Sequence, residues 1–232
     1  MEVIWQGLVE AVRLLLAGDP GVMEITWLSI KISGTATALS LFLGIPAGVA
    51  MALTRFVGRK FLVAVVNTGM GLPPVVVGLF VSIFLWRSGP LGAWELLYTP
   101  TAIVIAQFVI AAPIVTGLTI AAMQQLNPRL RLQLIALGAS RWQMLLLLMR
   151  EARLPLLAAV MAGFGGVISE VGASMMVGGN LLGHTRVLTT ATVLETGKGN
   201  FEIAIALGVL LLALTFGVNY LLTWIQQRGR SA

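Results

Sequence analysis

Glu170 is the residue whose chemistry is hardest to place, because it follows Ser169 inside a long apolar segment of the sequence. An ionised carboxylate in apolar surroundings is costly, so it normally faces a partner group or water. The carboxyl group could be a gate or an inter-helix hydrogen-bonding element, or it could simply hold Ser169, Gln107 or a backbone group. We favour the second interpretation, and we favour a proton relay least.

A second set of polar residues comes soon after this segment, and it comprises Asn180, His184, Thr185, Arg186 and Lys198. Exposed cations attract anions, so these residues could attract an anion to this loop. They could also contact a partner protein or lipid headgroups, which is the interpretation we favour. The chain has one histidine and no cysteine, so we expect no metal site.

Catalytic motifs are absent from the sequence. It contains no GxxxxGK[ST] phosphate loop, no HExxH and no GxSxG, which are the patterns of nucleotide, zinc and serine chemistry. We therefore expect a protein that is not an enzyme and that binds no cofactor of its own.

The composition indicates what kind of scaffold positions these residues. Of the 232 residues, 58% are hydrophobic and 10% are charged, which is too few polar side chains to cover a water-facing globule. The net charge is +6, but the charges cluster at the ends of apolar runs and no basic patch with interleaved aromatic residues is present. We therefore expect an all-α integral membrane protein and no nucleic-acid partner.

Five apolar segments reach the length of about 20 residues that a membrane-spanning helix needs. They are residues 27–54, 61–86, 101–123, 154–177 and 201–225. Before them, residues 3–17 have the spacing of a short amphipathic helix that lies in the membrane interface. The predicted organisation is thus an outer interfacial helix over 1–24, one transmembrane domain over 25–228 and a tail over 229–232.

The distribution of basic residues predicts how the spans are oriented. One set of connections carries ten of them, and the other set carries five. The larger set is Arg55, Arg59, Lys60, Arg129, Arg131, Arg141, Arg150, Arg153, Arg228 and Arg230; the smaller set is Arg13, Lys31, Arg87, Arg186 and Lys198. The larger set predicts the cytoplasmic side, so the N-terminus would lie outside and the C-terminus inside.

The connection over residues 124–153 is about 30 residues long, too long for a simple turn. Asn127-Pro128 predicts a helix start, and Gly138 predicts a flexible or left-handed corner. Ser140 is a suitable N-cap for a second helix. A helical elbow of this kind, standing out from a membrane bundle, is a docking surface.

This elbow resembles the cytoplasmic loop of binding-protein-dependent ABC importer permeases. Gly138, Ala139 and Ser140, followed by Arg141 and Trp142, match the core of the loop, and Leu154-Pro155 matches its end. Leu132-Gln133-Leu134 replaces the usual Glu-Ala-Ala, and the gap to Pro155 is longer than usual. The resemblance implies that residues 138–142 couple to a cytoplasmic ATPase.

The stretch over residues 163–212 is similar to the tungstate permeases, relatives of the molybdate and sulfate permeases. It carries Ser-Glu-Val-Gly-Ala, Val-Gly-Gly-Asn, Gly-His-Thr-Arg and Leu-Thr-Thr-Ala in that order. The resemblance implies a homodimer in a prokaryotic cytoplasmic membrane, with two ATPase subunits that use ATP and Mg²⁺ and an extracytoplasmic binding protein. Alternating access would then carry tungstate, or else molybdate or sulfate. A proton-coupled secondary carrier that uses Glu170 is the alternative from another class.

Several residues are candidates for gating or translocation. Pro73 and Pro74, together with Pro46 and Pro113, are expected to break helices at depth, either as packing kinks or as hinges. Gly172, after Ser169 and Glu170, allows close approach of helices. We expect packing to be its first role and motion its second.

Overall fold

The computed structural model describes residues 2–228, and within them the chain forms eleven α-helices, one 3-10 helix and no strand. The predicted all-α membrane fold is confirmed. The tail over 229–232 lies outside the described residues. The helices are α1 (Glu2–Ala17), α2 (Pro20–Leu53), α3 (Arg59–Met70), α4 (Pro74–Leu85), η1 (Gly92–Trp94), α5 (Pro100–Gln124), α6 (Pro128–Ala136), α7 (Arg141–Glu151), α8 (Arg153–Ile168), α9 (Gly172–Gly178), α10 (Leu188–Gly197) and α11 (Phe201–Arg228).

Three helices, α2, α5 and α11, are long and apolar enough to cross a membrane, and the number rises to five if each of two bent pairs is one span. The pair α3 and α4 bends by 105°, and the pair α8 and α9 bends by 56°. The predicted count of five spans is therefore met only when each bent pair is counted as one span. Residues 61–86 and 154–177 are each two helices; the break in the first segment was expected at Pro73 and Pro74, and the break in the second was not.

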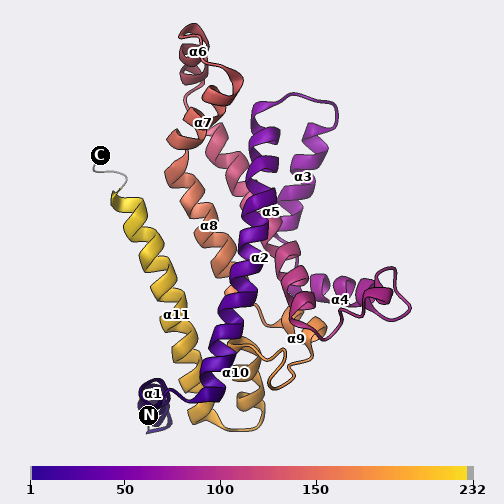
Figure 1. Cartoon of the computed structure of the whole chain (residues 1–232), viewed down its shortest axis with the longest axis vertical. Helices are drawn as coiled ribbons and strands as arrows, with labels where there is room; N and C mark the ends of the chain where they lie inside the picture. Colours follow the sequence, from indigo (N-terminus) through magenta and orange to yellow (C-terminus); the bar gives the residue numbers. More distant parts are fainter. Residues whose placement is uncertain (1, 229–232) are drawn as a thin grey trace.

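The first bend is caused by Pro73 and Pro74, as predicted. Neither proline has a backbone N–H, and Pro73 is extended with a ψ of 123°, so the helix that ends at Met70 cannot continue through them. Pro74 then begins α4, a position that suits the fixed φ of proline. As a result α4 leaves the direction of α3 and lies across the bundle (Figure 1).

Pro46 and Pro113 do not break helices, so our prediction for these two residues was wrong. They lie inside the continuous helices α2 and α5, which pack closely on each other. A methyl group added at Gly48 would lie 2.7 Å from Cβ of Thr119. An isolated proline removes one helical hydrogen bond, and close packing against neighbouring helices keeps the helix intact around it.

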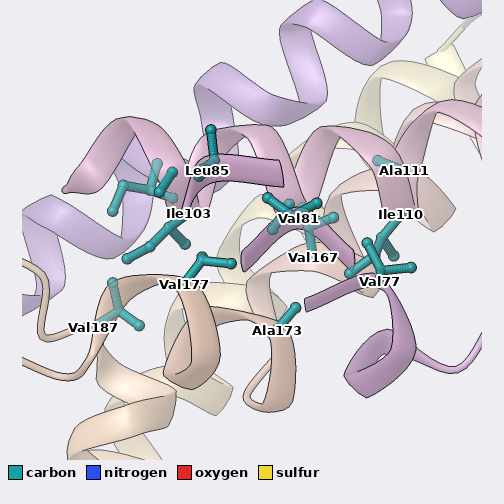
Figure 2. Packing of buried hydrophobic residues seen from close by; sticks show 13 residues of the cluster. Val77, Val81, Leu85, Ile103, Ile110, Ala111, Val167, Ala173, Val177 and Val187 are labelled. Atoms are coloured by element: carbon teal, nitrogen blue, oxygen red, sulfur yellow. The ribbon is translucent and has the colours of Figure 1, made fainter. Parts of the chain in front are cut away.

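The largest core cluster lies where α4, α5 and α9 meet. Val77 of α4 lies beside Ile110 of α5, and Val81 of α4 lies beside Val167 of α8 (Figure 2). Val177 of α9 belongs to the same buried cluster. Because α4 does not continue the direction of α3, its position is fixed by this burial of apolar surface.

The connections gather at two opposite ends of the molecule. The elbow formed by α6 and α7, the α2–α3 connection and the C-terminal end of α11 lie at one end, and α1 and α10 lie at the other (Figure 1). At the elbow end, Nε of Arg59 donates to the carbonyl of Met51 at 2.6 Å, and Nη1 of Arg131 donates to the carbonyl of Leu53 at 3.4 Å. These arginines therefore satisfy the last carbonyls of α2. Both lie at the elbow end of the molecule, as expected from their place in the larger predicted set of basic residues.

The first helix, α1, packs on α11 near residue Phe201, and it has three distinct faces. Gly7 and Ala11 are buried, and a methyl group at Gly7 would lie 2.5 Å from Cγ2 of Ile205. Glu10 and Arg13 pair at 3.5 Å on one flank. The remaining face exposes apolar side chains: Ile4, Trp5, Leu8, Val9, Val12 and Leu16. The amphipathic helix is present as predicted, and its place in the membrane interface stays a prediction.

Candidate functional site

The elbow is built by local capping interactions. Oδ1 of Asn127 accepts a hydrogen bond from the N–H of Arg129 at 2.9 Å and starts α6. Gly138 turns the chain with a φ of +76°, where a side chain would be strained. Ser140 then forms a capping box with Gln143, with N–H to side-chain oxygen distances of 3.3 and 2.8 Å. The corner and N-cap read from the sequence are therefore present.

One face of the elbow is anchored and the other is free. Leu148 is buried in a cluster with Val49 of α2 and Met123 of α5. On the outer side, Trp142 is 76% exposed and Leu137 is 83% exposed, on either side of the Gly138 corner. Arg141 is also exposed. An exposed apolar surface with a basic residue beside it, held on a rigid support, is typical of a protein-binding site.

The elbow is joined to the fourth span almost without interruption. Helix α7 ends at Glu151 and α8 begins at Arg153, and the intervening Ala152 is completely buried. The N–H of Ala152 donates to the carbonyl of Leu148 at 2.9 Å, and the N–H of Leu156 donates to the carbonyl of Ala152 at 2.9 Å. Helices α7 and α8 are therefore linked by a short, buried and hydrogen-bonded connection.

Glu170 lies at the bend between α8 and α9 and is 8% exposed. Its Oε1 accepts a hydrogen bond from the N–H of Ala173 at 2.8 Å, in the first turn of α9. Its backbone carbonyl accepts a hydrogen bond from Oγ1 of Thr189 at 2.9 Å, in the first turn of α10. The carboxyl group thus holds a backbone group. It is not hydrogen-bonded to Ser169, whose hydroxyl donates to the carbonyl of Gly165.

Gln107 is not hydrogen-bonded to Glu170 either. Its Nε2 donates to Oγ of Ser174 at 3.5 Å, a long hydrogen bond, and its buried Oε1 has no partner within the described part of the chain. Such an unsatisfied buried group is uncommon. The polar contact between α5 and α9 is therefore weak at this point, and apolar packing holds the two helices together.

The structure brings the two helix breaks together. Gly172 lies against Val75, the residue after Pro74, and a methyl group at Gly172 would lie 2.8 Å from Cγ2 of Val75. Gly78 lies against Ala173 in the same way. The five gating candidates (Pro73, Pro74, Ser169, Glu170 and Gly172) therefore lie in one region, where α4 contacts α9.

Most of the polar residues of the 179–187 loop serve the loop itself. Arg186 donates from Nε to Oδ1 of Asn180 at 3.2 Å and from Nη2 to its carbonyl at 3.3 Å. Thr185 is buried and donates to the carbonyl of Gly178, and its Oγ1 accepts from the N–H of Leu181. His184 is exposed. Asn180, Thr185 and Arg186 therefore stabilise the conformation of this loop.

Lys198 is paired with Glu195 at 2.8 Å, and Asn200 donates to the same carboxylate at 2.7 Å. The side-chain hydrogen bonds from Asn200 and Lys198 lower the pKa of Glu195. Among the described residues, no group of three or more His, Cys, Asp or Glu side chains could hold a metal ion.

Sequence reasoning missed two residues that organise this region, Thr189 and Ser29. Oγ of Ser29 in α2 accepts a hydrogen bond from the N–H of Leu188 at 2.8 Å, and Thr189 reaches Glu170 from another helix. The Leu-Thr-Thr-Ala run drew attention to Thr189 as part of a motif. The hydrogen bond from Thr189 to the carbonyl of Glu170 joins residues far apart in the sequence, so no local sequence pattern indicates it.

Comparison with known proteins identifies the family of this chain. A family described as "Binding-protein-dependent transport system inner membrane component" matches residues 44–231. The chain belongs to this family. It is therefore a multi-pass permease subunit of an ABC importer, the component that works with separate ATPase subunits and a binding protein and has no ATPase activity of its own.

Individual relatives agree with this assignment. The permease is 43% identical over 205 residues to the "Probable anion ABC transporter permease protein" of Haloferax volcanii, covering 86% of this chain and 88% of that protein. It is 40% identical over 227 residues to the "Tungstate uptake system permease protein TupB" of Peptoclostridium acidaminophilum, covering 98% and 100%. The resemblance to tungstate permeases is thus confirmed.

The fold also matches solved structures. An inward-facing structure of the MetNI methionine ABC transporter superposes with a TM-score of 0.74 at 20% identity, covering 90% of this chain and 94% of that one. At this level of identity the match shows a shared fold.

Proposed function

We propose that this permease carries an oxyanion, with tungstate as the first choice, by alternating access in a homodimer. Each protomer would work with one ATPase subunit, which uses ATP and Mg²⁺, and a substrate-loaded extracytoplasmic binding protein would deliver the anion. The similarity to a tungstate permease over nearly the full length of both chains supports this substrate. Molybdate and sulfate are the related substrates to be tested.

The observation that carries the mechanism is the continuity of the elbow with the fourth span. Trp142 and Leu137 are exposed apolar residues of the elbow, and α7, which bears Trp142, is joined to α8 through the single residue Ala152. ATP-driven closure of two ATPase subunits would draw the two elbows together and tilt the two copies of α8. The break at residues 169–171 would then pass this tilt to the opposite end of the permease.

The proposed topology follows from the same surface. The elbow end, with the α2–α3 connection and the C-terminal end of α11, would face the cytoplasm. Helix α1 and the 179–187 loop would lie on the outer side, with the apolar face of α1 in the lipid interface. The arginines at the elbow end support this orientation through the excess of positive charge on cytoplasmic loops.

Association with the ATPase tests the role of the elbow. We expect the wild-type permease to co-purify with its cognate ATPase. The variants Gly138→Asp and Arg141→Glu should no longer co-purify with it. Gly138→Asn should still co-purify, because asparagine tolerates a positive φ. If the wild type binds no ATPase and its transport follows a proton gradient, the proposal fails.

The substrate is tested with the complex in proteoliposomes. The cognate binding protein, loaded in turn with tungstate, molybdate or sulfate, is added outside, and ATP hydrolysis is measured inside. We expect the largest stimulation with tungstate. Stronger stimulation by molybdate or sulfate would reassign the substrate and leave the importer mechanism intact.

A further inference from the structure

The segment over residues 170–190, which we term the α9–α10 hairpin, is closed on itself by side-chain hydrogen bonds. At one end of α9, Thr189 donates to the carbonyl of Glu170 at 2.9 Å. At the other end, Nδ2 of Asn180 donates to the carbonyl of Thr190 at 3.3 Å. Thr185 and Arg186 fasten the connecting loop. The first turn of α10 is therefore tied to both ends of α9.

Glu170 takes part in two of these connections at once. Its carboxylate holds the N–H of Ala173 and its carbonyl holds the hydroxyl of Thr189. Glu170 is 8% exposed, Ala173 is 0% exposed and Thr189 is 5% exposed, so water does not compete for these hydrogen bonds. Glu170 thus joins α8, α9 and α10 at a single point.

The contacts between this hairpin and the rest of the bundle are uneven. The N–H of Leu188 donates to Oγ of Ser29 at 2.8 Å, and the N–H of Tyr98 donates to the carbonyl of Val177 at 2.8 Å. Against the middle of α5, in contrast, the polar contact is the long one between Gln107 and Ser174, at 3.5 Å. The hairpin is therefore held together by its own hydrogen bonds, whereas its contact with the middle of α5 is mainly apolar packing.

We propose that Glu170 and Thr189 are positioning residues for transport, which make α9 and α10 move as one unit with the C-terminal end of α8. A displacement of α10 would then reach α8 through the Thr189–Glu170 hydrogen bond, and α8 is joined to the elbow through Ala152. The proposal rests on the proposed function, since it supplies the path by which a loaded binding protein at the α10 end stimulates the ATPase at the elbow.

The decisive variant is Thr189→Val, which keeps the shape of the side chain and removes the hydroxyl. In proteoliposomes that contain the permease and its ATPase, two rates are measured: basal ATP hydrolysis, and hydrolysis with the cognate binding protein loaded with tungstate. We expect Thr189→Val to lower the stimulated rate about ten-fold, a typical size for coupling between sites, with the basal rate unchanged. Thr189→Ser should restore the stimulation.

Thr192→Val is the matched control. Thr192 lies one turn further along α10, and its hydroxyl donates to the carbonyl of Leu188 within the same helix at 2.8 Å. The Thr192→Val substitution therefore removes a hydroxyl from α10 and leaves the hydrogen bond between Thr189 and Glu170 in place. We expect normal stimulation.

Glu170 variants show whether the hydrogen bond or the charge matters. Glu170→Gln retains a side-chain oxygen that accepts from the N–H of Ala173, so we expect it to retain stimulation, whereas Glu170→Ala should lose it. Loss in Glu170→Gln as well would overturn a role that rests on hydrogen-bond geometry.

Two further outcomes would overturn the inference. One is full stimulation in Thr189→Val; the other is parallel loss of the basal rate and of complex yield, which would make Thr189 a purely structural residue. If the wild-type complex itself shows no stimulation by any loaded binding protein, the proposed function fails instead, so the two failures are distinguishable.

Discussion

The elbow and the α9–α10 hairpin are built alike and differ in where their side chains point. Each joins short helices through a glycine with a positive φ, Gly138 at +76° and Gly179 at +69°. In the elbow, Ser140 and Gln143 satisfy the helix start locally, which leaves Trp142 free on the surface. In the hairpin, Thr189 and Thr185 are turned inward and are buried.

This difference indicates two different mechanical tasks. A surface that docks a partner needs exposed side chains on a support that is already folded, since ordering that support on binding would cost affinity. A segment that transmits displacement needs buried hydrogen bonds that hold its parts at fixed distances. The elbow has the first property and the hairpin has the second.

The largest expected effect tests the docking role of the elbow. Trp142→Ala should weaken binding of the ATPase by about 2 kcal/mol or more, about a thirty-fold loss of affinity, as for a central interface tryptophan. Because Trp142 is 76% exposed, thermal unfolding of the isolated permease should barely change. Affinity is measured with detergent-solubilised permease and purified ATPase.

Trp94→Ala is the matched control for this measurement. Trp94 is similarly exposed, at 65%, and belongs to η1, which lies beyond the end of α4 and away from the elbow (Figure 1). Equal losses of affinity in the two variants would remove the distinction drawn between the elbow and the rest of the surface.

A smaller effect is expected where the two helix breaks meet. In Gly78→Ala, the new methyl group would lie 2.7 Å from Cα of Ala173, so α4 and α9 must separate, at a cost of about 1–3 kcal/mol. Gly165→Ala is the control, because no atom lies within 4 Å of the added carbon. There the substitution should be neutral or stabilising, by up to about 1 kcal/mol.

Thermal unfolding in detergent distinguishes these two variants. We expect Gly78→Ala to lower the Tm and Gly165→Ala to leave it unchanged or raise it. Equal Tm shifts would mean that α4 and α9 are not tightly packed at Gly78, which would contradict a close contact between the hairpin and the broken span formed by α3 and α4.

The elbow could be predicted from the sequence because its signals are local. Asn127 before Pro128, Gly138 at the corner and Ser140 as an N-cap each act on residues within one or two turns. The five apolar segments were also clear, since span length is set by the bilayer. The start of α2 was less clear. Asp19 accepts from the N–H of Val22 and starts the helix at Pro20 rather than at residue 27.

The hairpin could not be predicted because its contacts are distant in the sequence. Glu170 was recognised as an unusual buried carboxylate, but the hydroxyl that meets its carbonyl comes from Thr189. The prolines show the same limit. Pro73 lies two residues after Gly71 and directly before Pro74, so the helix breaks, whereas Pro113 packs against Gly69 and its helix continues. The meaning of a proline therefore depends on neighbours that the sequence does not place.

The smallest expected effect concerns pH at the end of α10. The hydrogen bonds from Asn200 and Lys198 lower the pKa of Glu195 from its ordinary value of 4.5. A carboxyl group with a depressed pKa in the folded state stabilises the protein above its unfolded pKa, and this contribution is lost as the pH falls through the lower, folded value. The side chain of Lys198 is 50% exposed, so the contribution should be less than about 1 kcal/mol.

Glu195→Gln isolates this contribution. At pH 7 the wild type should have a slightly higher Tm than Glu195→Gln, and the difference should shrink as the pH falls below 4.5. Binding of the ATPase should show no matching change, because the charges on the elbow surface are mostly arginines, which stay protonated. A Tm difference that is constant with pH would show that Glu195 acts through hydrogen bonds alone, and the two ends of the permease would then not differ in their response to acid.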